Sequence, residues 1–330
     1  MRCHVDTVRI YHKPSTPLVL NNSVGWKYFR KPNIEDSHFF IRYKGLSCHF
    51  YAYRHTYGEL WVTLSVPKLL EGSNLFPLDM ENLDTVLYER VNGILSEIIS
   101  VPVCDVAAWE VSRVDLFLLH RIAPRQRRWY LGAYSRLFLG TYTPCQYKNT
   151  FYLNSVLKRH KAAGTVVRVY AKLKELQDTD LKDLDKEFER YLELCDSLHD
   201  FIRIEFQFRR RVLRYFFNHA PSVTLADVMQ AGFQRERINR MIERLGLHRQ
   251  IISREHMRER LGEIFIKAPT LQRAKLYIRL VTGRGVYPAT IKGQLTAGQI
   301  AYIRKKLNEH DLHCIVAEGG HDLVPVTPLR

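Results

Sequence analysis

Regular alternation of apolar and polar residues in three short segments constrains the fold of this chain most. In FIRIEFQFR, at 201–209, the isoleucines and the last two phenylalanines share one face of an extended strand, and polar residues occupy the other. Nearly the same period of two occurs in VVRVYAKLK at 166–174 and in VSRVDLF at 111–117. Such alternation is typical of an antiparallel sheet that packs one face on a core and exposes the other to water.

Further elements follow from spacing. Strands are expected at 48–55 and 59–66, joined by a short turn that contains glycine, and at 150–153 and 166–173 as a second hairpin. Apolar residues three and four apart predict helices at 84–99, 125–139 and 180–199. After about residue 212 the pattern becomes helical, at 224–242 with a break at Gly232, and at 270–282 and 296–309, each of these two after a Thr cap.

These elements predict an α+β fold in two domains. A length of 330 residues is typical of about two domains. We expect a mostly antiparallel sheet with flanking helices over 1–211. A helical DNA-binding part, in a helix-turn-helix or winged-helix arrangement, is expected over 212–330.

The charge of the chain indicates an anionic partner. Lys and Arg number 50 against 34 Asp and Glu, a net charge of +16. Residues 201–330 hold 23 of these cations and 11 of the anions, so the C-terminal part carries most of the excess. Nucleic acid is the expected partner, although a basic surface that serves only solubility is the simpler reading.

Cysteine usage and hydropathy predict a protein of the cytoplasm. The six cysteines are scattered without a CxxC pair, which favours reduced thiols over a disulfide framework. The apolar runs are far shorter than the ~20 residues of a membrane span. The first residues hold no apolar stretch of signal length, so neither a membrane nor a secretory signal is expected.

One face of the predicted sheet gathers residues that carry chemistry. If the three alternating strands are neighbours, Asp115, Tyr170, Lys172 and Glu205 lie on a common face with several arginines. Two carboxylates suit a divalent metal, a tyrosine suits a phenolate nucleophile, and a lysine suits a phosphate. A solvated sheet face with ordinary cross-strand ion pairs explains the same pattern, and both readings stand at this point.

Several segments, in one order, resemble a known family. They are VPKLLEGSN at 66–74, SRVD at 112–115, NTFYLNS and VVRVYAKLKELQ within 149–177, FIRIEFQFR, and LYIRLVTGRGVYP at 276–288. The chain resembles the replication initiators of filamentous phages and related plasmids, the gene II / gene X replication protein family. The resemblance runs from about Cys48 to Leu312, and the set Tyr170, Lys172 and Glu175 is its most specific part.

The resemblance implies an origin-specific DNA nickase of rolling-circle replication. In that family a tyrosine attacks a phosphodiester of the supercoiled origin and becomes linked to the 5′ phosphate. The released 3′-OH primes synthesis, and the enzyme later rejoins the displaced strand into a circle. The implied setting is the cytoplasm of a bacterial host, with a host helicase and a single-strand-binding protein as partners. The sequence has no GxxxxGK[ST] motif that would drive unwinding itself.

Site residues are carried over from the family position by position. The nucleophile is Tyr170, Lys172 is the phosphate-facing cation, and Asp115 and Glu205 are the ligands of Mg²⁺ or Mn²⁺. Glu59 is the nearest candidate for a third ligand, since Trp61 occupies the expected position. His49 and His55 stay open as alternatives for that ligand, and Tyr152 as one for the nucleophile. The His-hydrophobic-His metal motif of many rolling-circle nickases does not occur in this sequence.

DNA contacts are expected from arginines and lysines in both parts. These are Arg113, Arg168 and Arg203 on the strands, and Arg235, Arg237, Arg240, Arg304 and Lys305 on the C-terminal helices. A helical cap that carries charge without touching DNA is an equal alternative for the C-terminal set.

Two other functions stay open. The first is a non-catalytic DNA-binding protein, such as a repressor or a copy-control factor. It would bind tightly without a covalent link and would be indifferent to Tyr170→Phe. The second is an RNA-binding module that uses an aromatic sheet face, and it would prefer RNA over supercoiled DNA.

Overall fold

The computed structural model describes residues 2–30, 37–52, 57–99, 105–137, 144–147, 150–153, 164–172, 175, 200–284, 293–318 and 320–329. The chain forms two compact units, one of residues 1–117 and 207–236 and the other of residues 118–206 and 237–330. This division differs from the boundary expected at residue 211. That boundary separates a catalytic part from a DNA-binding part, and it stays a prediction. Among the described helices, none combines the length and the apolar character that a bilayer span requires.

The first unit contains a large antiparallel sheet. Its strands are β2 (Val5–His12), β3 (Lys27–Arg30), β4 (Ser37–Tyr43), β5 (Leu46–Ala52), β6 (Glu59–Ser65) and β8 (Glu110–Ile122). They follow the order β3-β4-β5-β6-β2-β8, and the last residues of β12 (Asp200–Arg209) lie beyond β8. A separate pair joins β1 (Arg2–Cys3) to β7 (Leu78–Asp79). The expected pairing of the segments at 48–55 and 59–66 is confirmed by β5 and β6.

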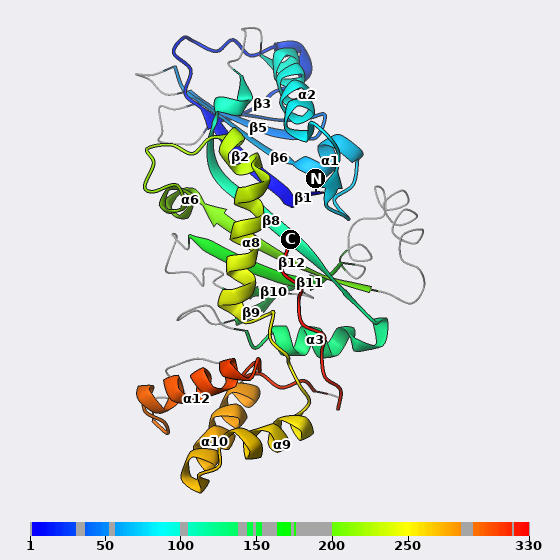
Figure 1. The fold of residues 1–330 in the computed structure, drawn as a ribbon. Coiled ribbons are helices and arrows are strands. Elements are labelled where there is room, and N and C mark those ends of the chain that lie inside the picture. The colour runs from blue at the N-terminus through cyan, green and yellow to red at the C-terminus, as the bar shows by residue number, and fades with distance from the viewer. Residues whose placement is uncertain are drawn as a thin grey trace. The chain divides into compact units, whose positions relative to one another are not determined.

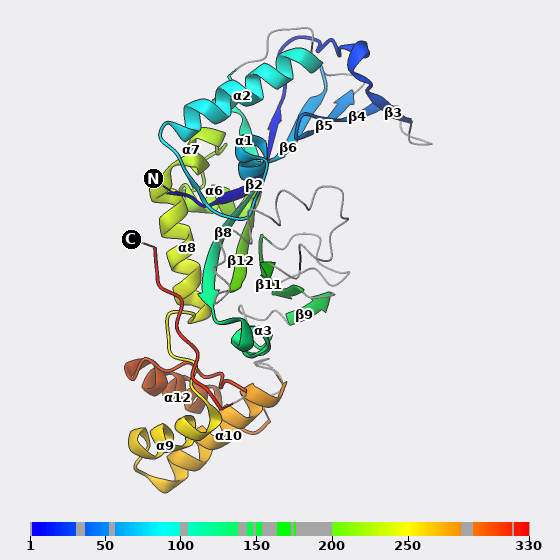
Figure 2. The same cartoon turned by 90° about the vertical axis from the view of Figure 1, so that its right-hand side faces the viewer.

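Helices cover this sheet through their apolar faces. Helix α2 (Leu83–Ile98) lies along one face of the sheet (Figures 1 and 2) and buries residues three and four apart, including Leu87, Val91 and Ile94. That spacing places these side chains on one side of the helix, and the helix expected at 84–99 is confirmed. The shorter helices of this unit are α1 (Val66–Glu71), α6 (Arg210–Phe216) and α7 (Leu225–Met229).

The second unit contains the last residues of β8 and most of β12. Beyond the end of β8 follow β12, β11 (Thr165–Ala171), β10 (Thr150–Leu153) and β9 (Pro144–Tyr147). The expected hairpin is confirmed, because β10 and β11 pair antiparallel with Thr150 opposite Tyr170. Helix α3 (Arg127–Tyr134) forms part of the segment expected at 125–139. The helix expected at 180–199 lies outside the described residues.

The regular elements described after residue 212 are helices, as expected. They include α8 (Ala231–Leu245), which begins in the first unit, then α9 (Arg254–Ile264), α10 (Ala268–Arg284) and α12 (Ala297–Glu309). Thr296 caps α12 with a capping box, as its position predicted. Thr270 is not a cap, because α10 starts two residues earlier and Pro269 occupies its first turn, where a missing N–H costs nothing.

The break between α7 and α8 is at Gln230 rather than at Gly232. The ψ angle of Gln230 is 124°, which ends α7, and Gly232 lies in the first turn of α8. Glycine at a helix start needs no special backbone angle, so its presence did not mark the boundary.

The polar face of β12 is not solvated, and this expectation was wrong. Arg203, Glu205 and Gln207 are all buried, as are the apolar residues between them. Arg203 donates to Glu205, and Gln207 donates to Asp115, so these buried side chains bond to protein groups in place of water. The period of two therefore separates two buried faces of different chemistry.

Candidate active site on β11 and β12

The centre of the candidate site is a tyrosine–glutamate pair in the second unit. β11 carries Tyr170 and its neighbour β12 carries Glu205. The hydroxyl of Tyr170 donates to Oε1 of Glu205 across 2.5 Å. Tyr170 is 5% exposed and Glu205 is 4% exposed. The pair is therefore screened from water, where a hydrogen bond to a charged acceptor is strong.

Cations surround this pair. Arg203 donates through Nε to the same Oε1 at 2.9 Å, and Arg168 reaches Oε2 at 3.2 Å. Lys172, which follows β11, bonds Oε2 of Glu175 at 2.6 Å, and its Nζ lies 5.9 Å from the centre of the Tyr170 ring. Among the described residues, three cations thus accompany two carboxylates in this cluster.

The environment sets which groups are charged. Burial raises the pKa of Tyr170 well above its usual value, and Glu205 and Glu175 add to that effect against Arg203. Burial also acts to raise the pKa of Glu205, but Arg203, the bond from Tyr170, Arg168 and Lys172 outweigh it and hold that pKa below its usual value. Burial lowers the pKa of Lys172. At neutral pH, Tyr170 is a phenol that faces an ionised proton acceptor.

Asp115 and Glu59 lie in the first unit and have partners of their own. Asp115, on β8, accepts from Nε of Arg113 at 2.8 Å and from the amide of Gln207 at 3.1 Å. Glu59, at the start of β6, pairs with Lys13 at 2.8 Å and accepts from the Trp61 indole at 3.1 Å. The sequence reasoning gave Gln207 no role, although its place on the polar face of 201–209 was a usable signal.

The described carboxylates do not fit a metal site as they stand. Glu205 is bonded to two guanidiniums, Asp115 to Arg113 and Glu59 to Lys13. Oxygens that a divalent cation would need are thereby held by protein cations. Within the described ranges, no three His, Cys, Asp or Glu side chains are grouped so that they could hold a metal.

The alternative residues for the third metal ligand and for the nucleophile have different neighbours. His49 forms part of a stacked row with His38 and Tyr51, and its Nδ1 lies 2.9 Å from His38 Nε2. His55 lies outside the described residues. Tyr152, on β10, is opposite Arg168 and therefore on the same face of the sheet as Tyr170.

The residues proposed to contact DNA differ in exposure. Arg235, Arg240 and Lys305 are exposed on their helices. Arg237 is buried, and Arg304 is half-buried and donates to the Tyr277 hydroxyl at 2.7 Å. Of the strand arginines, Arg203 is fully buried. Exposure therefore favours the first three as DNA contacts.

No family model, curated protein or solved structure matches this chain. Membership of the gene II / gene X family accordingly stays a prediction from the residues quoted above. The geometry of the site supplies its own argument for function.

Proposed function

We propose that this chain nicks and rejoins DNA at a replication origin through a covalent link between Tyr170 and a 5′ phosphate. The observation that carries the proposal is the 2.5 Å hydrogen bond from Tyr170 to the ionised Glu205, which also contacts Arg168 and Arg203. Such a pair supplies a nucleophile and its base, and the cations supply charge for a phosphate.

The proposed cleavage balances in protons and electrons. Glu205 accepts the phenolic proton, the Tyr170 oxygen forms a bond to phosphorus, and the bond from phosphorus to the 3′ oxygen breaks. The 3′ oxygen takes a proton from solvent and leaves as a hydroxyl. Rejoining reverses these steps, since a 3′-OH attacks the phosphotyrosine and Tyr170 recovers its proton from Glu205.

Proton transfer also changes the local charge. Once Glu205 is neutral, its ion pairs with Arg168 and Arg203 are weakened, and these guanidiniums can attract the phosphate in the transition state. Lys172 lies beside the Tyr170 ring and adds a third cation. This exchange of partners is the reason to assign the arginines to catalysis as well as to folding.

The resemblance also implies Mg²⁺ or Mn²⁺, and we keep that requirement as a separate proposal. The described carboxylates already pair with protein cations, which a metal would have to displace. The remaining expectations follow as proposals: a supercoiled origin and a displaced single strand as substrates, a host helicase and a single-strand-binding protein as partners, and a bacterial cytoplasm as the setting.

The test is a nicking assay on supercoiled DNA of the protein's own replicon. Wild type, Tyr170→Phe and Tyr152→Phe are incubated with Mg²⁺, with Mn²⁺ and with chelator, and the products are run on a denaturing gel. Tyr152→Phe is the matched control, because it removes a hydroxyl on the same sheet face. We expect open circles with protein on the 5′ end for wild type and the control, and none for Tyr170→Phe.

Other outcomes assign the activity differently. Nicking that survives in Tyr170→Phe but not in Tyr152→Phe would move the nucleophile to Tyr152. Products in chelator equal to those with metal would remove the metal from the proposal.

Burial favours a second candidate function, a DNA-binding protein without catalysis. Tyr170 is 5% exposed, and its cluster is a buried network of ion pairs, which serves stability alone equally well. Under that function the same assay gives DNA that is shifted but uncut in all three proteins.

A further inference from the structure

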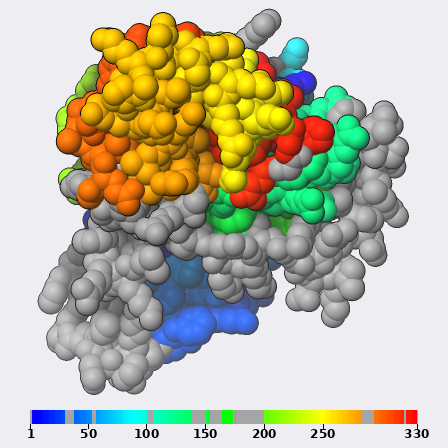
Figure 3. Space-filling view, turned by 90° about the horizontal axis from the view of Figure 1, so that it is seen from below, coloured from blue at the N-terminus to red at the C-terminus, as the bar shows by residue number. Residues whose placement is uncertain are grey.

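A cavity of about 500 Å³ lies between α9 and α10 in the second unit. Its volume is within the range of sites that hold small ligands or single groups of larger ones. The helices α9 and α10 adjoin on the surface seen in Figure 3, where they are yellow and orange. The sequence reasoning assigned nothing to this place.

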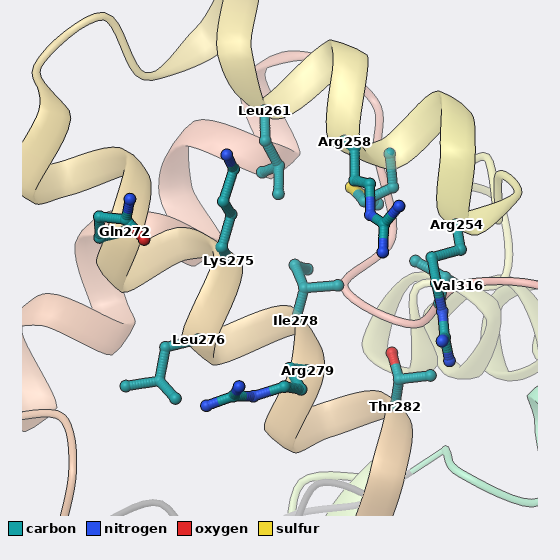
Figure 4. A pocket seen from close by; sticks show the side chains of 11 residues that line it. Arg254, Arg258, Leu261, Gln272, Lys275, Leu276, Ile278, Arg279, Thr282 and Val316 are labelled. Atoms are coloured by element: carbon teal, nitrogen blue, oxygen red, sulfur yellow. The ribbon is translucent and has the colours of Figure 1, made fainter.

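Four exposed cations line the cavity in two rows. Arg254 and Arg258 extend from α9 toward α10, and Lys275 extends from α10 toward α9, with Arg279 one turn further along (Figure 4). Within the described part of the chain, none of the four forms an ion pair, and no acidic residue lines the cavity. Members of each row are about 6 Å apart along the helix axis. An anion with several charges at regular intervals fits such rows better than a single phosphate does.

The floor of the cavity is apolar except for one hydroxyl. Met257, Leu261 and Ile278 are buried beneath the cations. Thr282 is 7% exposed, and its Oγ1 is buried without a hydrogen-bond partner in the described structure. Figure 4 shows this oxygen pointing into the space between the helices. An unsatisfied buried hydroxyl costs free energy, so its position suits a ligand that supplies the missing partner.

We propose that this groove binds single-stranded DNA, with phosphates on the four cations and a base over the apolar floor. The cations match a polyanion, the floor matches the flat face of a base, and Thr282 matches the polar edge of that base. The choice of DNA as occupant rests on the proposed function. The groove would hold the displaced strand while Tyr170 acts elsewhere in the same unit.

The experiment measures binding of a labelled single-stranded oligonucleotide to the full chain by fluorescence anisotropy over a range of salt. The test variant is Arg258→Gln with Lys275→Gln. The control is Arg260→Gln with Arg273→Gln, which removes the same charge from the same two helices outside the cavity. We expect the slope of log affinity against log salt to fall by about 1.4 in the test variant, since each phosphate contact contributes about 0.7. The control slope should stay unchanged.

A second variant separates the hydroxyl from charge. Thr282→Val should weaken oligonucleotide binding severalfold at fixed salt and leave the slope unchanged. Equal slopes in the test and control variants would overturn the proposal. Competition by polyglutamate as strong as that by the oligonucleotide would also overturn it, in favour of an acidic protein partner. If the salt slope falls in the test variant only when duplex DNA replaces the oligonucleotide, the proposal is overturned in favour of duplex binding.

This test is independent of nicking. A chain that never cuts DNA but shows the expected change of slope would refute the proposed function and keep the groove. A chain that nicks through Tyr170 with an unchanged slope would do the reverse.

Discussion

Arg203 and Tyr170 bond to the same carboxylate oxygen, Oε1 of Glu205, at 2.9 Å and 2.5 Å. Arg203 is fully buried, so it has no water to replace that contact. The second guanidinium at Glu205, that of Arg168, is partly exposed and contacts the other oxygen. The two arginines therefore differ in what their removal costs.

We expect Arg203→Met to destabilise the fold by about 3–5 kcal/mol, because it removes the cation of a buried ion pair and leaves the carboxylate buried. Arg168→Met should cost less than Arg203→Met, because the Arg168 side chain is 27% exposed and stays partly hydrated. Urea unfolding followed by tryptophan fluorescence measures both, with exposed Arg235→Met as the control. Equal costs for Arg203→Met and Arg168→Met would contradict the assigned difference in burial.

Glu205→Gln should lower the nicking rate by about 10²–10⁴-fold, because the amide cannot accept the phenolic proton. Glu97→Gln is the control, since that carboxylate is exposed and pairs with Lys44 in the first unit. Single-turnover nicking measures both variants. Glu205→Asp keeps the charge and shows whether a loss comes from chemistry or from folding. A rate in Glu205→Gln within threefold of wild type would remove the base from the mechanism.

His120 makes the fold sensitive to mild acid. Burial lowers its pKa from 6.5 to about 4, and its Nε2 has no hydrogen-bond partner among the described residues. The unfolded chain binds the proton below pH 6.5 and the folded chain only near pH 4. Stability is therefore lost as the pH falls through that window, by about 3 kcal/mol in full.

The substitution His120→Leu should remove most of that loss. The free energy of unfolding is measured in urea at pH 7 and at pH 4. Its loss between these two pH values should be about 3 kcal/mol smaller in this variant than in wild type. His310, which is exposed, provides the control as His310→Leu. An unchanged pH dependence in His120→Leu would show that other groups control acid sensitivity.

Thr282→Val should leave stability unchanged or raise it by about 1 kcal/mol, because it removes a buried hydroxyl that has no partner. Thermal unfolding of the free protein measures this, with Thr270→Val on the same helix as the control. A clear loss of stability in Thr282→Val would show that the hydroxyl already has a partner in the fold.

Periodicity predicted most of the described strands and helices, because each keeps one face apolar. It also placed Tyr170 and Glu205 on the polar faces of two strands, because it predicted strands at both 166–173 and 201–208. It did not show that the polar face of β12 is buried, as alternation separates two faces but does not tell which of them meets water. Boundaries such as Gln230 depend on a single backbone angle that many residues adopt.

The groove between α9 and α10 was beyond sequence reasoning for a different reason. The chain has 50 Lys and Arg, and the pattern does not tell which of them find carboxylates. Arg260 pairs with Glu263, whereas Arg258, two residues away, forms no ion pair among the described residues. The direction of each side chain on the folded helix makes that difference.

The division of each unit into two stretches of chain affects synthesis. The first unit needs residues 207–236, where Val223 accepts a backbone hydrogen bond from Val111 and Leu225 donates one to Trp109. A ribosome reaches residue 236 roughly 10 s after residue 117, at the usual rates of elongation. During that delay the nascent β8 lacks these partners. The first unit therefore cannot complete its fold until residues 207–236 have been synthesised.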